Sequence, residues 1–432
     1  MSILTCAVCG FGGRGCDSYA SYQLAHPDQL RVTAVADPSD DRIRIAQTRY
    51  GVPDARCFRS GEELMAQPKL ADVLIIATQD KDHMRYALPA LEKGYHLLLE
   101  KPISDDLGEC IALREQARRC GRIVMVCHVL RYAPFYETVH RLLQEGRIGR
   151  LQSLQASENV GYWHFSHSYV RGNWRRRDES SPVILAKSCH DMDILRWLAD
   201  APCHRVSSFG SLGWFRAENA PEGSADRCIR CAVRSGCPYD AEKLYLTDER
   251  TGLLHGHTGW PCSVLVGTEP TEAAVRRALE IGPYGRCVYR CDNDVADHQV
   301  VNLEFEGGVT ASFTLSAFSN ECHRTLAATG SMGEIFGDVE ENRVTLHVFG
   351  KPTEVFNLDV EVSEYAGHGG GDWRMMAELC RLLSSGETEA RTGIDVSIES
   401  HAIALAAEES RLRGGAVVDL PAYMQSVQKS EV

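Results

Sequence analysis

Six residues directly after the first expected strand can bind a phosphate-rich ligand through their backbone. Gly10-Phe11-Gly12-Gly13-Arg14-Gly15 has G-x-G-x-x-G spacing, between an apolar strand over residues 3–9 and a helical stretch over residues 16–25. Such glycines allow a tight turn and let backbone N–H groups approach a pyrophosphate at a helix N-terminus. The pattern predicts a dinucleotide site; the alternative is a plain glycine turn.

Asp37 strengthens the dinucleotide interpretation. It ends the second expected strand, 22 residues after Gly15. At this spacing an acidic residue binds the adenosine ribose hydroxyls. Because its carboxylate would repel a 2′-phosphate, NAD is favoured over NADP. The alternative is that Asp37 caps the helix beginning near Ser39.

A group of cysteines has the spacing of a metal site. Cys228-x-x-Cys231 and Cys237 are close to a zinc-knuckle pattern, and Cys262 is our candidate for the fourth ligand. The surrounding segment is poor in apolar periodicity, so a structural zinc ion would stabilise it. The alternatives are unliganded thiols or an iron–sulfur cluster, whose C-x2-C-x2-C spacing is not met. Other possible ligands are His255, His257, Cys287 and Cys291.

Alternating strands and helices must position the dinucleotide site. Apolar strands over residues 72–77, 95–99 and 122–127 alternate with helices over residues 82–93 and 105–120. This order predicts a parallel sheet covered on both faces. Ligands of such sheets bind at the carboxyl ends of the strands. The residues at those ends are the glycine segment, Asp37, Thr78, Lys101 and His128.

Composition limits the possible partners. The chain has 432 residues, 44% of them apolar, and a net charge of −13. Two or three domains are expected from this length. The acidic balance argues against nucleic acid or an anionic membrane as partner, and no apolar run is long enough to cross a bilayer. The start of the chain lacks the pattern of a secretory signal, so we expect a cytoplasmic protein whose 17 cysteines are reduced.

At Glu100-Lys101-Pro102 the sequence resembles the Gfo/Idh/MocA family of oxidoreductases. Arg131-Tyr132-Ala133-Pro134 and His190-x-x-Asp193 extend the resemblance. It implies an α/β fold with an N-terminal Rossmann domain over residues 1–130. A C-terminal α+β domain over residues 131–432 would follow, built on a large, open, mainly antiparallel sheet and carrying the Cys-rich insert at about 211–292.

The resemblance also implies ligands and assembly. NAD and a sugar-like substrate would meet between the two domains, and the large sheet would form a homodimer or homotetramer. The Lys101–Pro102 peptide would be cis. Glu100 would lie beside the cofactor, with Thr78 and His128. The candidate substrate contacts are Lys101, Arg131, Trp163, His190 and His368. Asp372 either caps the helix that follows it or contacts substrate.

Lys101 and His190 are the first candidates for chemistry. Hydride transfer from a secondary alcohol requires a group that removes the hydroxyl proton and a cation that stabilises alkoxide character. A lysine at a strand end can supply that charge; the alternative is a surface lysine before a proline. His190 matches the family's general base, and its unperturbed pKa of about 6.5 suits that task. The alternative is a histidine that merely begins a helix.

The residues around His190 depart from the family pattern. The family commonly places an aspartate four residues before the histidine, where this chain has Ala186. Lys187, Asp191 and Asp193 are the candidates to orient His190. We therefore take Lys101, His190, Lys187 and Asp193 as candidate catalytic residues.

Three functions follow. The leading one is an NAD-dependent oxidoreductase that takes a hydride from a secondary hydroxyl of a sugar, cyclitol or glycoside. The second is a glycoside hydrolase that retains NAD and works by transient oxidation, elimination and re-reduction. The third is a non-catalytic nucleotide-sensing protein.

Overall fold

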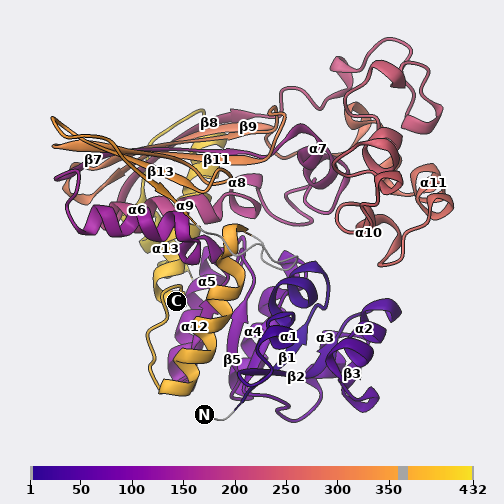
Figure 1. The fold of residues 1–432 in the computed structure, drawn as a ribbon, viewed down its shortest axis with the longest axis horizontal. Helices are drawn as coiled ribbons and strands as arrows, with labels where there is room; N and C mark the ends of the chain where they lie inside the picture. Colours follow the sequence, from indigo (N-terminus) through magenta and orange to yellow (C-terminus); the bar gives the residue numbers. More distant parts are fainter. Residues whose placement is uncertain (1–2, 359–367, 431–432) are drawn as a thin grey trace.

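The computed structural model describes residues 3–358 and 368–430. Its N-terminal part contains a six-stranded parallel sheet with strand order β3-β2-β1-β4-β5-β6, the order of a Rossmann sheet (Figure 1). The strands are β1 (Leu4–Cys9), β2 (Leu30–Ala36), β3 (Cys57–Phe58), β4 (Val73–Ile76), β5 (His96–Leu99) and β6 (Val124–Val126). The predicted parallel sheet is confirmed.

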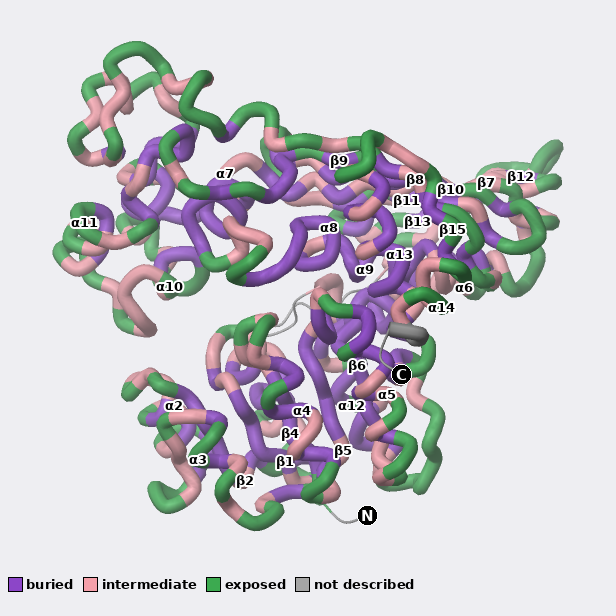
Figure 2. The backbone as a smooth tube through the Cα atoms, turned by 180° about the vertical axis from the view of Figure 1, so that it is seen from behind, coloured by how far each residue is buried: buried purple, intermediate pink, exposed green. Residues whose placement is uncertain are grey.

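Both faces of this sheet are buried, which explains why its strands are continuously apolar. Leu97 and Leu99 belong to a hydrophobic cluster with residues of α3 (Gly61–Met65), α4 (His83–Glu92) and α5 (Leu107–Cys120). Leu98, between them, points into a second cluster with α2 (Asp40–Tyr50). Most residues of the central strands are buried (Figure 2). Because side chains alternate between two buried faces, most positions in these strands are apolar.

A late segment of the chain completes the second cluster. Helix α12 (Gly371–Ser385) places Met375, Met376 and Leu379, each fully buried, among the residues of β1 and β4. The N-terminal core therefore includes residues from the far end of the sequence. A helix supplied from so far away ties the two parts of the molecule together.

The C-terminal part is built on a nine-stranded sheet with order β14-β13-β12-β11-β7-β10-β9-β8-β15. All neighbouring strands are antiparallel except β7 and β10. The strands are β7 (Leu151–Asn159), β8 (Cys203–Ser211), β9 (His298–Phe305), β10 (Thr310–Ser316), β11 (His323–Gly330), β12 (Gly333–Asp338), β13 (Arg343–Val348), β14 (Glu354–Asn357) and β15 (Val418–Asp419). The predicted large, mainly antiparallel sheet is confirmed.

One face of this sheet is covered by helices that lie toward the N-terminal part (Figure 1). They are α6 (Pro134–Gln144), α9 (Cys189–Ala199) and α13 (Ile394–Leu412). Strands β9 and β10 alternate buried and exposed side chains, as expected when only one face is covered. Helix α14 (Leu420–Ser430) follows the last strand.

The segment between β8 and β9 is irregular, as its sequence predicts. It holds α10 (Cys262–Val266), α11 (Glu272–Ile281) and several single turns, at the end of the large sheet near α7 (Tyr162–Phe165) (Figure 1). Its own hydrophobic cluster is small and includes Tyr245, Val275 and Leu279. None of the described helices is long and apolar enough to cross a membrane.

Leu379→Ala tests the role of α12 in the N-terminal core. Removing a fully buried leucine side chain leaves a cavity and lowers the free energy of unfolding by about 2–5 kcal/mol. Leu412→Ala is the control because Leu412 is 52% exposed; we expect a change within about 0.5 kcal/mol. Denaturant unfolding of both variants measures the difference, and equal effects would contradict the packing described here.

Candidate active site

The glycine segment has the geometry that a pyrophosphate requires. Gly10 has φ +86°, and a Cβ there would lie 2.5 Å from the carbonyl oxygen of Ala77. A Cβ on Gly15 would overlap the carbonyl oxygen of Gly10, whereas Gly12 and Gly13 face open space. The outer glycines are therefore needed for the turn and for close packing. The two inner ones leave the backbone open to a ligand, which fits a bound dinucleotide.

Asp37 is joined to this loop. Its Oδ2 accepts a hydrogen bond from the Phe11 N–H at 2.8 Å, and its Oδ1 accepts one from the Ser39 N–H at 2.9 Å. Burial raises the pKa of Asp37. The N-cap of α2 is Ser39, whose hydroxyl accepts from the Arg42 N–H, so the capping interpretation of Asp37 is wrong. Each carboxylate oxygen retains a lone pair for a further donor.

Arg14 connects the glycine segment to two other parts of the chain. Its Nε lies 2.6 Å from Glu100 Oε1, and its Nη2 lies 2.7 Å from Asp372 Oδ1. Glu100 also accepts a hydrogen bond from the Lys101 N–H at 3.0 Å. The N-cap of α12 is Gly370 without a side-chain bond, so the capping alternative for Asp372 is wrong. Burial alone would raise the pKa of Asp372, but Arg14 and His368 hold it well below its ordinary range.

Lys101 reaches across to the segment that carries His190. Its Nζ donates a hydrogen bond of 2.8 Å to the carbonyl oxygen of Ala186, the last residue of α8 (Val183–Ala186). Ala186 occupies the position where the family commonly has an aspartate, and here the backbone carbonyl contacts the lysine instead. The Lys101–Pro102 peptide is cis, as the resemblance implies.

His190 lies in the first turn of α9 and is 3% exposed. Its ring centroid is 5.9 Å from that of His128 and 5.6 Å from that of His368. Its buried Nδ1 has no hydrogen-bond partner. Burial, and then the positive charge of Lys101, lower the pKa of His190 well below its ordinary value. The ring is therefore neutral at pH 7 and can accept a proton.

The polar residues predicted to orient His190 are bound elsewhere. Asp193 makes a two-pronged ion pair with Arg131, with N–O distances of 2.7 and 2.8 Å. Its Oδ2 also lies 4.0 Å from Nδ1 of His128, whose ring is fully buried behind that of His190. The Asp193 carboxylate is therefore engaged by Arg131.

Asp191 and Lys187 belong to a second ion network. Asp191 Oδ1 lies 3.0 Å from Arg324 Nε, and Arg324 also pairs with Glu158. Glu158 Oε1 in turn lies 3.3 Å from Lys187 Nζ. Burial is the main cause that raises the pKa of Asp191 to about 6. Glu158 and Arg324, which are both buried, belong to no motif and could not be singled out from local sequence.

The remaining candidates lie around this centre. His368 Nδ1 is 3.2 Å from Asp372 Oδ2. Trp163 packs against Trp260 of the insert at 5.6 Å between ring centroids, and its buried Nε1 has no hydrogen-bond partner. Thr78 follows β4 at the same edge of the sheet as the glycine segment.

The predicted zinc set is not assembled. Within residues 3–358 and 368–430, no three His, Cys, Asp or Glu side chains are placed to hold a metal ion. The choice of Cys262 as fourth ligand also needs correction. Cys262 is fully buried in the apolar cluster with Tyr245 and Val275, and it does not line the small cavity that Cys228, Cys231 and Cys237 share.

Two family models match almost the whole chain. The model described as oxidoreductase family, NAD-binding Rossmann fold, matches residues 4–128. The model described as oxidoreductase family, C-terminal alpha/beta domain, matches residues 140–419. The chain belongs to the Gfo/Idh/MocA oxidoreductase family. It is an oxidoreductase of that family with an NAD-binding Rossmann fold, as the residues predicted.

Individual relatives are distant. A putative oxidoreductase, YteT, of Bacillus subtilis is 22% identical over 74% of this chain and 74% of its own length. Inositol 2-dehydrogenase 2 of Saccharopolyspora erythraea is 30% identical over 44% of this chain and 52% of its own length. An inositol dehydrogenase homolog from Azotobacter vinelandii, solved with NAD+, has a TM-score of 0.68 at 16% identity, covering 97% of both chains. The solved structure shows the same fold, and the family assignment rests on the two family models.

Asp37→Ser tests the preference for NAD. Removing the carboxylate removes a partner for the ribose hydroxyls and the charge that repels a 2′-phosphate. We expect NAD to bind about 10-fold more weakly, the effect of losing about 1.4 kcal/mol, and NADP to bind more tightly than in the parent. Calorimetric titration with each nucleotide measures both effects. Asp28→Ser, at an exposed aspartate, is the control, and an unchanged NAD/NADP ratio in Asp37→Ser would contradict the assignment.

Proposed function

We propose that this chain is an NAD-dependent dehydrogenase acting on a secondary hydroxyl of a sugar, cyclitol or glycoside. One observation carries the proposal: Lys101 contacts the Ala186 carbonyl at 2.8 Å and thereby lies near His190, a neutral base. A cation and a proton acceptor next to each other are what oxidation of an alcohol requires. The names of the inositol dehydrogenases among its relatives support a polyhydroxylated substrate.

His190 accepts the hydroxyl proton in this mechanism. Its ring is neutral because burial and the nearby cations disfavour the imidazolium form. As the proton leaves, the Lys101 ammonium stabilises the negative charge that develops on the oxygen. NAD, when bound, supplies the hydride acceptor. The imidazolium that results is a strong acid for a histidine, so it passes its proton on readily.

The other candidates position these two groups or contact ligand. Asp193 and Arg131 form a buried ion pair next to His128, whose ring lies against that of His190. Lys187, paired with Glu158, and His368 present polar atoms for substrate hydroxyls, and Trp163 presents a ring face. The cofactor would lie over the glycine segment, with Asp37 on its ribose and with Thr78 and Glu100 at the ends of β4 and β5.

The large sheet is the surface that we propose for assembly into a homodimer or homotetramer. Its uncovered face carries Phe209 (54% exposed) and Val300 (41% exposed), which are neighbours across β8 and β9. Phe336 on β12 and Val355 on β14 are also exposed. Exposed apolar residues gathered on one face usually mark a protein interface.

A panel of sugars, cyclitols and glycosides tests the activity. With the correct substrate we expect one NADH for each product molecule. His190→Ala should lower kcat about 10²–10⁴-fold without weakening NAD binding, and Lys101→Met should lower kcat because alkoxide charge is no longer stabilised. His255→Ala and Lys351→Met, at exposed positions, are the matched controls.

Other results would overturn the proposal in distinguishable ways. Release of an aglycone without net NADH would identify an NAD-retaining hydrolase. NAD binding with no reduction by any compound of the panel would favour a sensing protein. Full turnover by His190→Ala would remove His190 from the mechanism.

The depressed pKa of His190 predicts the pH dependence. A histidine whose pKa is lowered stays neutral, and competent as a base, down to a pH below its ordinary value. The acid limb of kcat/KM, which reports the free enzyme, should therefore have its midpoint below about pH 6.5. Initial rates at constant ionic strength from pH 4.5 to 9 measure it. A midpoint at or above 6.5 would show that His190 is not the group that titrates.

A further inference from the structure

Four cysteines of the insert line one small cavity. Cys228 and Cys231 lie at the two ends of one turn, Cys237 follows the next turn, and Cys287 comes from much later in the sequence. Cys287 is brought to them by an antiparallel bridge between Arg227 and Arg286 and by a 2.8 Å hydrogen bond from its N–H to the Asp226 carbonyl. The cavity measures about 20 Å³, enough for one water-sized sphere.

A buried arginine on the same cavity has no anionic partner. Arg171 is 0% exposed and donates to the carbonyl oxygens of Arg286 at 2.8 Å and Tyr239 at 2.7 Å, and to Cys228 Sγ at 3.5 Å. Its Nη1 has no hydrogen-bond partner. Among the described residues no carboxylate pairs with it; the charges that act on it belong to cysteines and a tyrosine.

The other charged groups at this cavity do not compensate Arg171. Asp240 accepts a hydrogen bond from the Glu242 N–H, and Arg234 pairs with Glu242. An isolated buried cation is costly, and such groups are normally paired with an opposite charge. The missing negative charge has one source within contact of Arg171, the thiol groups.

We propose that Cys228, Cys231, Cys237 and Cys287 bind one zinc ion as thiolates, with Arg171 as the buried counter-charge. Zn²⁺ with four thiolates carries a net charge of −2, which a neighbouring guanidinium stabilises. The C-x2-C turn supplies the first pair of ligands, as in structural zinc sites. A cavity of about 20 Å³ is the size expected for a single ion, which would have Zn–S distances of about 2.3 Å.

Zinc binding requires a local rearrangement. In the residues that the structure describes, these sulfur atoms do not yet stand in a metal geometry, so the side chains that border the cavity must turn toward its centre. Zinc displaces the thiol protons when it binds, and the resulting thiolates are the ligands that the ion requires.

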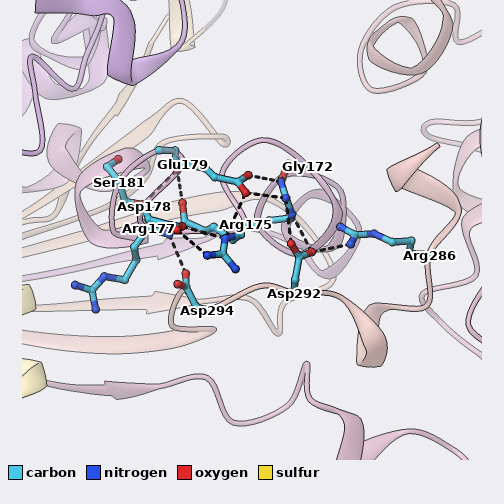
Figure 3. Close-up of polar contacts among 11 residues, drawn as sticks. Gly172, Arg175, Arg177, Asp178, Glu179, Ser181, Arg286, Asp292 and Asp294 are labelled. Carbon is cyan, nitrogen blue, oxygen red and sulfur yellow. Dashed lines mark hydrogen bonds and ion pairs between the residues drawn. The ribbon is translucent and has the colours of Figure 1, made fainter.

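The site would stabilise a loop that contacts the N-terminal part. Arg286, next to Cys287, and Arg175 both bind Asp292, at 2.6 and 3.0 Å (Figure 3). Trp174, next to Arg175, donates to Asp80 Oδ1 at 3.2 Å, and Ser181 donates to Asp80 Oδ2 at 3.1 Å. Asp80 lies just after β4, at the edge of the sheet where ligands bind. Zinc would therefore hold the insert in the position from which it supports this loop.

Metal analysis of the purified full-length protein tests the proposal independently of any activity. We expect about one zinc per chain by plasma mass spectrometry and four sulfur neighbours at about 2.3 Å by X-ray absorption at the zinc edge. Zinc below about 0.1 per chain overturns the proposal, as do nitrogen or oxygen atoms in the first shell. Several irons per chain with acid-labile sulfide would identify a cluster instead.

Variants test the identity of the ligands. Cys287→Ser should lose most of the zinc and unfold at a lower temperature, whereas Cys262→Ser should keep its zinc. Cys120→Ser, at a partly buried cysteine outside the insert, is the general control. Loss of zinc in Cys262→Ser with retention in Cys287→Ser would overturn the ligand set. If Cys287→Ser does not fold, the absorption spectrum of the parent still decides the number of sulfur ligands.

Discussion

The ion network around Arg14 is the interaction on which the geometry of the candidate site depends. One guanidinium binds Glu100, the residue before Lys101, and Asp372, in the first turn of α12. Both carboxylates are buried and would be costly without a partner. The glycine segment, the end of β5 and the returning helix are therefore fixed relative to one another. The glycine segment and Lys101 are therefore both positioned by the Arg14 side chain.

This arrangement explains why α12 belongs to the N-terminal core although it follows the large sheet in sequence. Its apolar face, with Met375, Met376 and Leu379, closes one face of the parallel sheet. Its first turn presents Asp372 to Arg14, and His368, in the turn just before the helix, lies near His190. Packing and polar contacts thus arise from one helix, so a change in its position would alter the core and the candidate site together.

Local patterns were sufficient to predict the elements but not the polar pairings. The Rossmann sheet was predicted from residues close in sequence: alternating apolar strands and helices, the glycine spacing and Asp37. The structure confirmed this sheet. Asp372 looked like a helix cap because local rules favour an aspartate there. Its partner, Arg14, is 358 residues away, and such a contact cannot be predicted from sequence periodicity. The useful signal was the arginine inside the glycine segment, a charge that needs a partner when buried. Local spacing likewise did not connect Cys287 to Cys228, because the two cysteines are distant in sequence.

The distribution of charge around His190 accounts for the missing aspartate at position 186. Each carboxylate near it is already bound: Asp193 by Arg131, and Asp191 and Glu158 by Arg324. Among the described residues, the charges that most lower the pKa of His190 belong to Lys101, two neighbouring histidines and Arg324, after the larger effect of burial. An aspartate at position 186 would raise the pKa of the histidine and stabilise its protonated form. Here the Ala186 carbonyl accepts a hydrogen bond from Lys101 instead. His190 therefore stays neutral, and the positive charge stays on Lys101. Proton acceptance and charge stabilisation are thereby kept on separate groups.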